Sequence, residues 1–210
     1  MAFVLTEEEQ GLLTRTARDA ITTYLKKGVT IPRPKDTPDK LLQKCGVFVT
    51  LHNISGGREL RGCIGFPRPT LPLIDATIDA AISAAVRDPR FPPVTLSEMK
   101  EIVIEISVLT PPQLIKVRDP REYPSRIRIG RDGLMIQKGP YSGLLLPQVA
   151  TEEGWDPEEF LCHCCLKAWL PPDEWLSSDT RVYRFQAIIF EEEAPGGRAR
   201  EKGAPSSVTP

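Results

Sequence analysis

The chain has 210 residues, of which 40% are hydrophobic and 26% are charged. This balance is close to that of an average globular protein and excludes collagen-like, coiled-coil and wholly disordered chains. The length fits one large domain or two small interlocked ones. Lysine and arginine total 27 and aspartate and glutamate 28, so the net charge of -1 provides no global basic field for nucleic acid or an anionic membrane.

The first residues and the cysteines both indicate a cytoplasmic protein. Residues 1–5 are apolar only briefly before Thr6 and three glutamates, which is too short a run for a secretory signal. Nowhere do about 18 apolar residues follow one another, so we expect no membrane-spanning helix. Five cysteines are an odd number and too few for a disulfide scaffold of this length, which favours a reducing compartment.

Helical and alternating patterns define the first half of the chain. A capping box at Thr6 and Glu9, followed by apolar residues at helical spacing, predicts the first helix. Alternating apolar residues on both sides of a Ser-Gly-Gly turn predict a β-hairpin. The expected elements are a helix over 6–27, a hairpin over 46–64, a helix over 70–86 and a strand over 102–108.

The second half repeats a similar order. An Asp132-Gly133 turn between two alternating runs predicts a second hairpin, and Pro171-Pro172 ends a third helix. From Ala194 onward, glycine, proline and serine predict a polar tail. The expected elements are a hairpin over 126–136, an extended run over 143–146, a helix over 156–169, a strand over 181–190 and the tail over 194–210.

Hairpin, helix and strand thus occur in the same order over 46–109 and over 126–190. This order predicts two related β-β-α-β halves that contribute to one sheet. Because hairpins dominate over crossovers, the fold class is α+β with a mainly antiparallel sheet and flanking helices. We expect a single domain over 1–193, with a subdivision into interlocked halves left open.

The densest chemical signal is the hexapeptide Leu60-Arg61-Gly62-Cys63-Ile64-Gly65. Strand geometry puts the Arg61 guanidinium and the Cys63 thiol on one face. A neighbouring guanidinium favours a thiolate, and the glycines leave room for another molecule, which indicates an activated nucleophile or a ligand site. The alternative is that Cys63 is a small buried hydrophobe and that the glycines permit close packing.

The same hexapeptide resembles the signature of the AMMECR domain family. Four further segments match that family in the same order, namely 88–94, 105–109, 133–134 and 146–156. The resemblance covers about residues 5–190, and the chain is most similar to the short, single-domain archaeal members. It implies an α+β fold with duplicated segments around a cleft.

The resemblance implies less about activity, because no activity is established for the family. Its members are often encoded beside Memo-type proteins and accompanied by a radical S-adenosylmethionine protein, which implies a role in a modification pathway. Many relatives have histidine where this chain has Asp132, so a mechanism that needs a histidine there has no support. Trp169 also replaces the usual glycine near the end of the third helix.

Metal and cofactor signals are weak. On a helix Cys162 and Cys165 share a face, whereas His163 and Cys164 point elsewhere, so a core-facing pair is favoured over a metal site. His52, beside the hairpin turn, is expected to be solvated. The sequence has no Walker loop or dinucleotide fingerprint, so we expect no metal and no cofactor.

An anionic ligand is the expected partner. The segment from Lys138 to Ser142 is expected to be a polar loop that can present amides, a hydroxyl and an ammonium group to an anion. Several arginines could also meet at the cleft and bind phosphate, carboxylate or an RNA backbone. These arginines are Arg58, Arg61, Arg68, Arg87 and Arg90.

Two functions therefore remain open. In the first, the chain is an enzyme with Cys63 as nucleophile, Arg61 as its electrostatic partner and Glu105 as acid or base, acting on an anionic small molecule or nucleotide. In the second, it is a non-catalytic module that binds RNA, a nucleotide or a partner protein. The ligand-binding residues expected in either case are Arg61, Gly62, Gly65, Arg90, Lys138 and Ser142.

Overall fold

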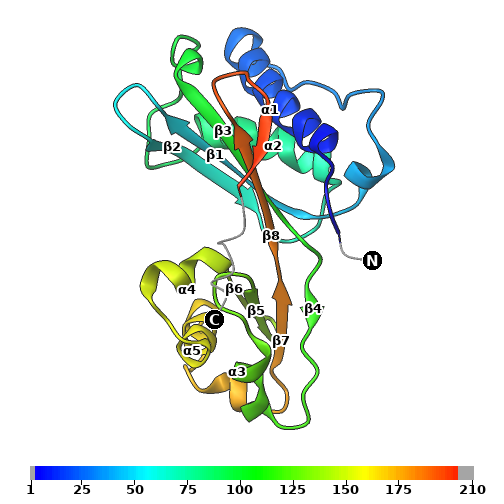
Figure 1. Cartoon of the computed structure of the whole chain (residues 1–210), viewed down its shortest axis with the longest axis vertical. Helices are drawn as coiled ribbons and strands as arrows, with labels where there is room; N and C mark the ends of the chain where they lie inside the picture. Colours follow the sequence, from blue (N-terminus) through cyan, green and yellow to red (C-terminus); the bar gives the residue numbers. More distant parts are fainter. Residues whose placement is uncertain (1–2, 203–210) are drawn as a thin grey trace, which may run out of the picture. The chain divides into compact units, whose positions relative to one another are not determined.

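The computed structural model describes residues 3–202, which form two compact units (Figure 1). Unit 1 runs up to Leu109 and resumes over Ile188–Lys202, whereas unit 2 comprises Thr110–Ala187. Unit 2 is therefore inserted between two strands of unit 1.

Unit 1 contains a five-stranded sheet in the order β2-β1-β3-β8-β9. Strand β1 pairs antiparallel with β2 and β3, and β9 pairs antiparallel with β8. The elements of unit 1 are α1 (Glu7–Lys27), η1 (Asp39–Leu42), β1 (Gly46–Asn53), β2 (Glu59–Phe66), α2 (Leu73–Val86), η2 (Glu98–Lys100), β3 (Ile102–Leu109), β8 (Ala187–Glu192) and β9 (Ala199–Glu201).

The core of unit 1 lies between one face of this sheet and the helices α1 and α2. Val47, Val49 and Leu51 alternate along β1 and are fully buried. Because strand side chains alternate between faces, the residues between them point to the opposite face of the sheet. The predicted capping box is present, with Thr6 accepting from the Glu9 backbone and Glu9 accepting from that of Thr6. The helix, hairpin and strand expected in the first half are thus confirmed.

A β-bulge interrupts the first hairpin next to the signature hexapeptide. Gly62 lies opposite Leu51, but Leu60 lies opposite His52, so Arg61 is the extra residue on β2. A bulge bends a strand and redirects the side chain at that position. The strict alternation expected over 60–64 therefore ends at Arg61.

Unit 2 contains a four-stranded sheet in the order β4-β7-β5-β6. Strand β5 pairs antiparallel with both β6 and β7, and a separate apolar core lies between this sheet and α5. The elements of unit 2 are β4 (Gln113–Leu114), η3 (Pro120–Glu122), α3 (Tyr123–Arg126), β5 (Gly133–Lys138), β6 (Tyr141–Leu145), α4 (Pro147–Glu153), α5 (Pro157–Lys167), η4 (Glu174–Leu176) and β7 (Arg181–Phe185).

The second hairpin differs from the expected one. Residues 126–129 form no strand, because the buried Asp132 accepts from the Arg128 backbone and holds this segment in a turn. The hairpin is instead β5–β6, and its tight turn contains Gly139 at a φ of 53°. A positive φ favours glycine, which explains why the chain reverses there.

The last predicted strand is in fact two strands. Residues 181–185 belong to the sheet of unit 2 and residues 187–192 to that of unit 1. Gln186 separates them, and its backbone bonds to Thr110, where the chain enters unit 2. The predicted polar tail also differs over its first part, because β9 pairs with β8. Residues 203–210 lie outside the described residues.

The two units share one strand arrangement. The order β2-β1-β3 in unit 1 corresponds to β6-β5-β7 in unit 2, each with a hairpin followed by helix and strand. Gly62 and Gly143 occupy matching positions, since a Cβ on Gly62 would meet the Ala84 carbonyl oxygen and a Cβ on Gly143 the Ala168 nitrogen. Both glycines let the end of a helix approach the sheet closely. The α+β class with two related halves is confirmed, but there are two antiparallel sheets and not one.

Candidate functional site around Cys63

Three polar side chains form a row across unit 1, on the sheet face opposite α1 and α2. Cys63 of β2 lies opposite Thr50 of β1, and Thr50 lies opposite Glu105 of β3. The Thr50 hydroxyl donates to the Cys63 sulfur at 3.3 Å, and the thiol is partly exposed. The corresponding row of unit 2 is Leu144, Met135 and Tyr183, so unit 1 alone carries this chemistry.

The Asp88-Pro89-Arg90 segment binds both the backbone N–H and the backbone carbonyl of Cys63. The Asp88 carboxylate accepts from the Cys63 N–H at 2.8 Å, and Arg90 donates to the Cys63 carbonyl at 3.3 Å. Arg90 also forms a two-pronged pair with Asp88, at 2.9 and 2.7 Å. The Arg90 guanidinium holds the pKa of the buried Asp88 well below its usual range, against the effect of burial. Two sequence segments that resemble the family thus meet at the backbone of Cys63.

Arg61 does not contact the thiol, contrary to expectation. Its guanidinium pairs with Glu98 at 2.8 Å and donates to the Pro92 carbonyl at 2.9 Å. Among residues 3–202, the arginine that donates a hydrogen bond to Cys63 is Arg90, through the Cys63 carbonyl, and the Cys63 side chain, after Asp88, also raises the pKa of Arg90. The bulge redirects Arg61 toward the 88–98 loop, so Arg61 fixes that loop to β2.

The signature glycines have a packing role. A Cβ on Gly62 would lie 2.2 Å from the Ala84 carbonyl oxygen, and one on Gly65 would lie 2.3 Å from the Phe48 ring. Neither gap is free space, because α2 and Phe48 already fill them. Ligand binding by the two glycines stays a prediction.

Glu105 lies at the centre of a charged cluster. It accepts from Lys202 and from Arg58, and the His52 Nε2 atom lies 3.6 Å away. Burial would raise its pKa, but the His52 imidazole and the Lys202 ammonium outweigh burial and lower it to about 2. Glu105 is therefore ionised at neutral pH and does not serve as an acid there.

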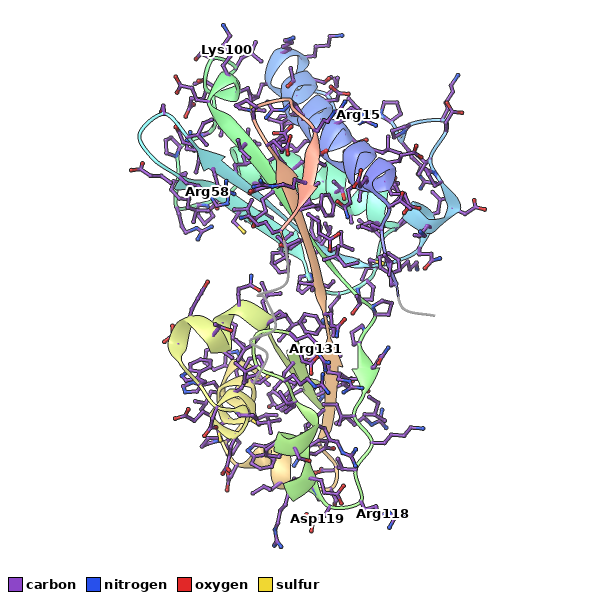
Figure 2. All side chains as sticks on the ribbon, viewed as in Figure 1. Arg15, Arg58, Lys100, Arg118, Asp119 and Arg131 are labelled. Atoms are coloured by element: carbon purple, nitrogen blue, oxygen red, sulfur yellow. The ribbon has the colours of Figure 1, made fainter. Side chains whose placement is uncertain are left out.

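Glu191 of β8 extends this cluster. It accepts from Arg58 and lies 3.1 Å from the Lys202 ammonium. Figure 2 shows Arg58 beside the β1–β2 hairpin. Lys202 directly follows β9, so this strand places the Lys202 ammonium beside Glu105 and Glu191. The sequence alone did not predict this contact.

His52 differs from the expectation that it is solvated. The residue is not simply solvated, because its side chain is only 17% exposed and both ring nitrogens are buried without a hydrogen-bond partner in the described part of the chain. Thr50 and Asp88 were not expected in the site, although Asp88 begins the segment 88–94 that resembles the family. Thr50 lies opposite Cys63 because of the strand register, and Asp88 reaches the Cys63 N–H from the loop that follows α2.

The expected arginines do not gather around one ligand. Arg58, Arg61 and Arg90 each pair with a different carboxylate, although Arg61 and Arg90 lie 6.0 and 5.5 Å from the centre of the Phe91 ring. Arg87 contacts the Ser83 hydroxyl at 3.3 Å. Three of the five predicted arginines are thus paired with carboxylates within unit 1, whereas the described residues provide no ion pair for Arg68 or Arg87.

Lys138 and Ser142 belong to unit 2 and are strand residues rather than loop residues. Ser142 lies opposite Gln137 in the β5–β6 hairpin. The Lys138 ammonium pairs with Glu174 and with Asp179, and both carboxylates raise its pKa. Binding of an anion by these two residues stays a prediction.

The cysteine cluster on α5 also differs from expectation. Cys164 and Cys165 are fully buried, whereas Cys162 is only partly buried, so Cys164 faces the core. Burial raises the pKa of Cys165 to about 11. His163 stacks on Trp155 with ring centres 3.8 Å apart. Within residues 3–202, no three His, Cys, Asp or Glu side chains are placed to hold a metal ion.

Fold and site define an α+β protein with a partly exposed cysteine on the sheet face opposite α1 and α2. A family model described as AMMECR1 matches residues 14–190, so the chain belongs to the AMMECR1 family. Protein PYRAB00100 of Pyrococcus abyssi is 60% identical over 199 residues, which are 93% of this chain and 97% of that protein. Protein MJ0810 of Methanocaldococcus jannaschii is 56% identical over 200 residues, which are 95% and 98% of the two chains.

The crystal structure of the uncharacterized protein PH0010 from Pyrococcus horikoshii matches the fold. Its TM-score is 0.80 at 57% identity, and the match covers 94% of this chain and 98% of that one. The resemblance to the family and its archaeal members is thereby confirmed. Among the described helices, none is long and apolar enough to cross a membrane.

Proposed function

We propose that the protein is an enzyme whose reacting group is the Cys63 thiol. The observation that carries this proposal is the Thr50 hydroxyl bond to a partly exposed sulfur whose backbone is held by Asp88 and Arg90. A fixed, accessible thiol with a hydrogen-bond donor is suited to act as nucleophile or thiolate ligand. Glu105 acts as an anionic partner on the same face and not as a proton donor.

The substrate class that we propose is an anionic small molecule, including nucleotides, in a cytoplasmic modification pathway. All five cysteines are free, which agrees with a reducing compartment. Memo-type and radical S-adenosylmethionine proteins are the proposed pathway partners, and this rests on the resemblance alone.

The rate of alkylation of each cysteine by iodoacetamide, resolved by peptide mass mapping against pH, tests the proposal. Thr50→Val should slow alkylation of Cys63 at neutral pH several-fold, because valine keeps the shape and removes the donor. Cys162, which is also partly exposed, should react unchanged and serves as the internal control. Arg61→Ala should leave the Cys63 rate unaltered, since Arg61 binds Glu98.

A Cys63 that is inert to iodoacetamide in the folded wild-type protein would contradict the enzyme proposal. The second candidate, a non-catalytic module that binds RNA, a nucleotide or a protein, is favoured by one observation. Arg61, the expected activator of the thiol, is tied to Glu98 and the Pro92 carbonyl. RNA retention that falls steeply with salt in both wild-type and Cys63→Ser protein would support this module.

A further inference from the structure

A basic segment of unit 2 lies outside the site described above. Residues 116–132 contain six lysines and arginines but three acidic residues, although the whole chain is almost neutral. Two of those carboxylates have structural roles. Asp132 is buried and binds Arg131 at 2.8 and 2.9 Å, and Asp119 caps η3 by accepting from the Arg121 backbone at 2.9 Å.

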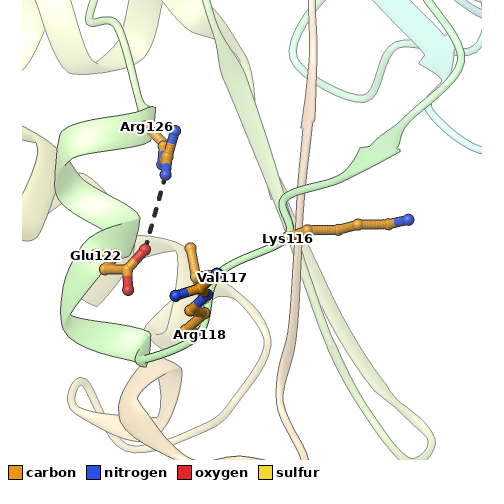
Figure 3. A pocket seen from close by; sticks show the side chains of 5 residues that line it. All are labelled: Lys116, Val117, Arg118, Glu122 and Arg126. Atoms are coloured by element: carbon orange, nitrogen blue, oxygen red, sulfur yellow. Dashed lines mark ion pairs between the residues drawn. The ribbon is translucent and has the colours of Figure 1, made fainter.

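Four charged residues of this segment line a hollow of about 440 Å³, whose lining residues are Lys116, Val117, Arg118, Glu122 and Arg126. Figure 3 shows Arg118 turned toward the helical turn that carries Glu122 and Arg126, whereas Lys116 extends away from it. Its volume falls in the range of small-molecule sites, which is roughly 300–1,000 Å³.

The cations of this hollow are incompletely neutralised. The one ion pair described among its lining residues joins Arg126 to Glu122 at 3.8 Å, a long separation between groups that are 57% and 38% exposed. Exposed pairs of this kind are weak and rearrange at little cost. For Arg118 and Lys116, the described residues provide no ion pair.

We propose that this hollow binds a phosphorylated small molecule that carries hydroxyl groups. Arg118 and Arg126 supply two planar guanidinium groups, which bind phosphate oxygens in a two-pronged manner. Glu122 accepts a hydrogen bond from a ligand hydroxyl, and Val117 provides an apolar wall. Lys116 adds positive charge at the rim and increases the rate of encounter.

Isothermal titration calorimetry of the full chain at low salt tests the proposal, with ribose 5-phosphate, inorganic phosphate and ribose as probes. We expect ribose 5-phosphate to bind more tightly than phosphate, and ribose not to bind. Arg118→Ala and Arg126→Ala should each weaken ribose 5-phosphate binding by about tenfold. Glu122→Gln should reduce the advantage of ribose 5-phosphate over phosphate.

Arg121→Ala is the matched control, because it removes one positive charge from the same segment and does not line the hollow. Arg121→Ala should change the dissociation constant for ribose 5-phosphate by no more than about twofold. Amide chemical-shift changes on wild-type protein should map to residues 116–126. Equal losses in all three arginine variants, no binding at about 10 mM ligand, or binding of an RNA oligonucleotide only would each overturn the proposal.

Discussion

At the scale of single residues, the described contacts of Cys63 are hydrogen bonds that fix its backbone and its sulfur in place. Asp88 accepts from the Cys63 N–H, Arg90 donates to the Cys63 carbonyl, and Thr50 donates to the Cys63 sulfur. A buried carboxylate that accepts from a backbone N–H and pairs with arginine fixes a loop strongly, because breaking it leaves an unpaired charge. The position of the thiol thus depends on a residue 25 positions away in the chain.

We expect Asp88→Asn to destabilise the protein by about 2 kcal/mol and to change the alkylation rate of Cys63. The reason is loss of the pair with Arg90 and of the anionic acceptor for the Cys63 N–H. The free energy of unfolding in urea and peptide mass mapping measure the two effects. Asp75→Asn is the matched control, since its pair with Arg33 is solvent-exposed and its loss should cost less than about 1 kcal/mol.

Protonation of Asp88 should have the same effect as this substitution. Because its folded pKa is lowered, the stability that it contributes is present above its ordinary pKa and is lost as pH falls through the folded value. The difference between wild type and Asp88→Asn should therefore shrink in strong acid. A difference that stays constant from neutral to acidic pH would exclude a role for the ionised carboxylate.

Trp169 adopts a backbone conformation that usually favours glycine. Its φ is 61°, a left-handed conformation that favours glycine, and its side chain is 89% exposed. Conformations of this kind cost about 1–3 kcal/mol for most residues. This cost arises between the backbone and Cβ, so exposure of the indole does not remove it, and the family resemblance implies glycine at this position.

At the scale of elements, the short C-terminal strand contributes more than its length indicates. Strand β9 pairs with β8, and Lys202 directly after it contacts both Glu105 and Glu191. Gln10 of α1 also donates to Glu201 at 3.0 Å. This segment is therefore part of unit 1 and completes the charged cluster next to the candidate site.

Deleting residues 199–210 should lower the melting temperature more than deleting residues 203–210. The two truncated proteins differ only in β9 and Lys202. We expect these residues to contribute about 1 kcal/mol to the free energy of unfolding, or roughly 2–4 °C in melting temperature for a chain of this size. Differential scanning calorimetry of both truncated proteins measures it. Equal melting temperatures would show that β9 adds nothing to stability.

Lys202→Met should lower the free energy of unfolding by an amount that depends on pH. The Glu105 pKa is lowered to about 2, so its stabilising contribution is full above its ordinary pKa near 4.5 and disappears as pH falls toward 2. Removing the ammonium should therefore reduce stability most above about pH 5 and little near pH 2. Urea unfolding across this pH range measures the difference in the free energy of unfolding between wild type and Lys202→Met. A difference that grows in acid would contradict a role for the Lys202–Glu105 ion pair.

At the scale of the whole molecule, one strand order is used twice with different chemistry. Each unit has its own apolar core, and unit 2 enters and leaves at adjacent residues, because the Thr110 N–H donates to the Gln186 carbonyl at 2.8 Å. Chain segments with separate cores and adjacent ends commonly fold as independent domains.

We therefore expect residues 110–187 to fold when produced alone. The isolated segment should give a cooperative thermal transition by circular dichroism and dispersed amide resonances. A short Gly-Ser linker in place of 110–187 should likewise leave unit 1 folded, with Cys63 alkylation as in the full chain. An unfolded isolated segment would show that unit 2 depends on unit 1 for its stability.

The sequence by itself determined the elements and the fold class. Helical spacing and a capping box specify α1, and alternation specifies β1, β2 and β3, because these signals act between residues close in the chain. The hexapeptide around Cys63 also identified the family. Local signals were insufficient at 126–129, where a buried Asp132 overrides strand propensity, and at Gln186, where one run divides between two sheets.

Only the tertiary structure decided the partners of each site residue. Strand register placed Thr50 beside Cys63 and Glu105 beside Thr50, a bulge directed Arg61 to Glu98, and the final strand brought Lys202 to Glu105. Register, bulges and loop closure join residues that are far apart in the chain, and each depends on the packing of the whole unit. For this reason the sequence indicated Cys63 and Glu105 as site residues, whereas their partners Thr50, Asp88 and Lys202 depended on the fold.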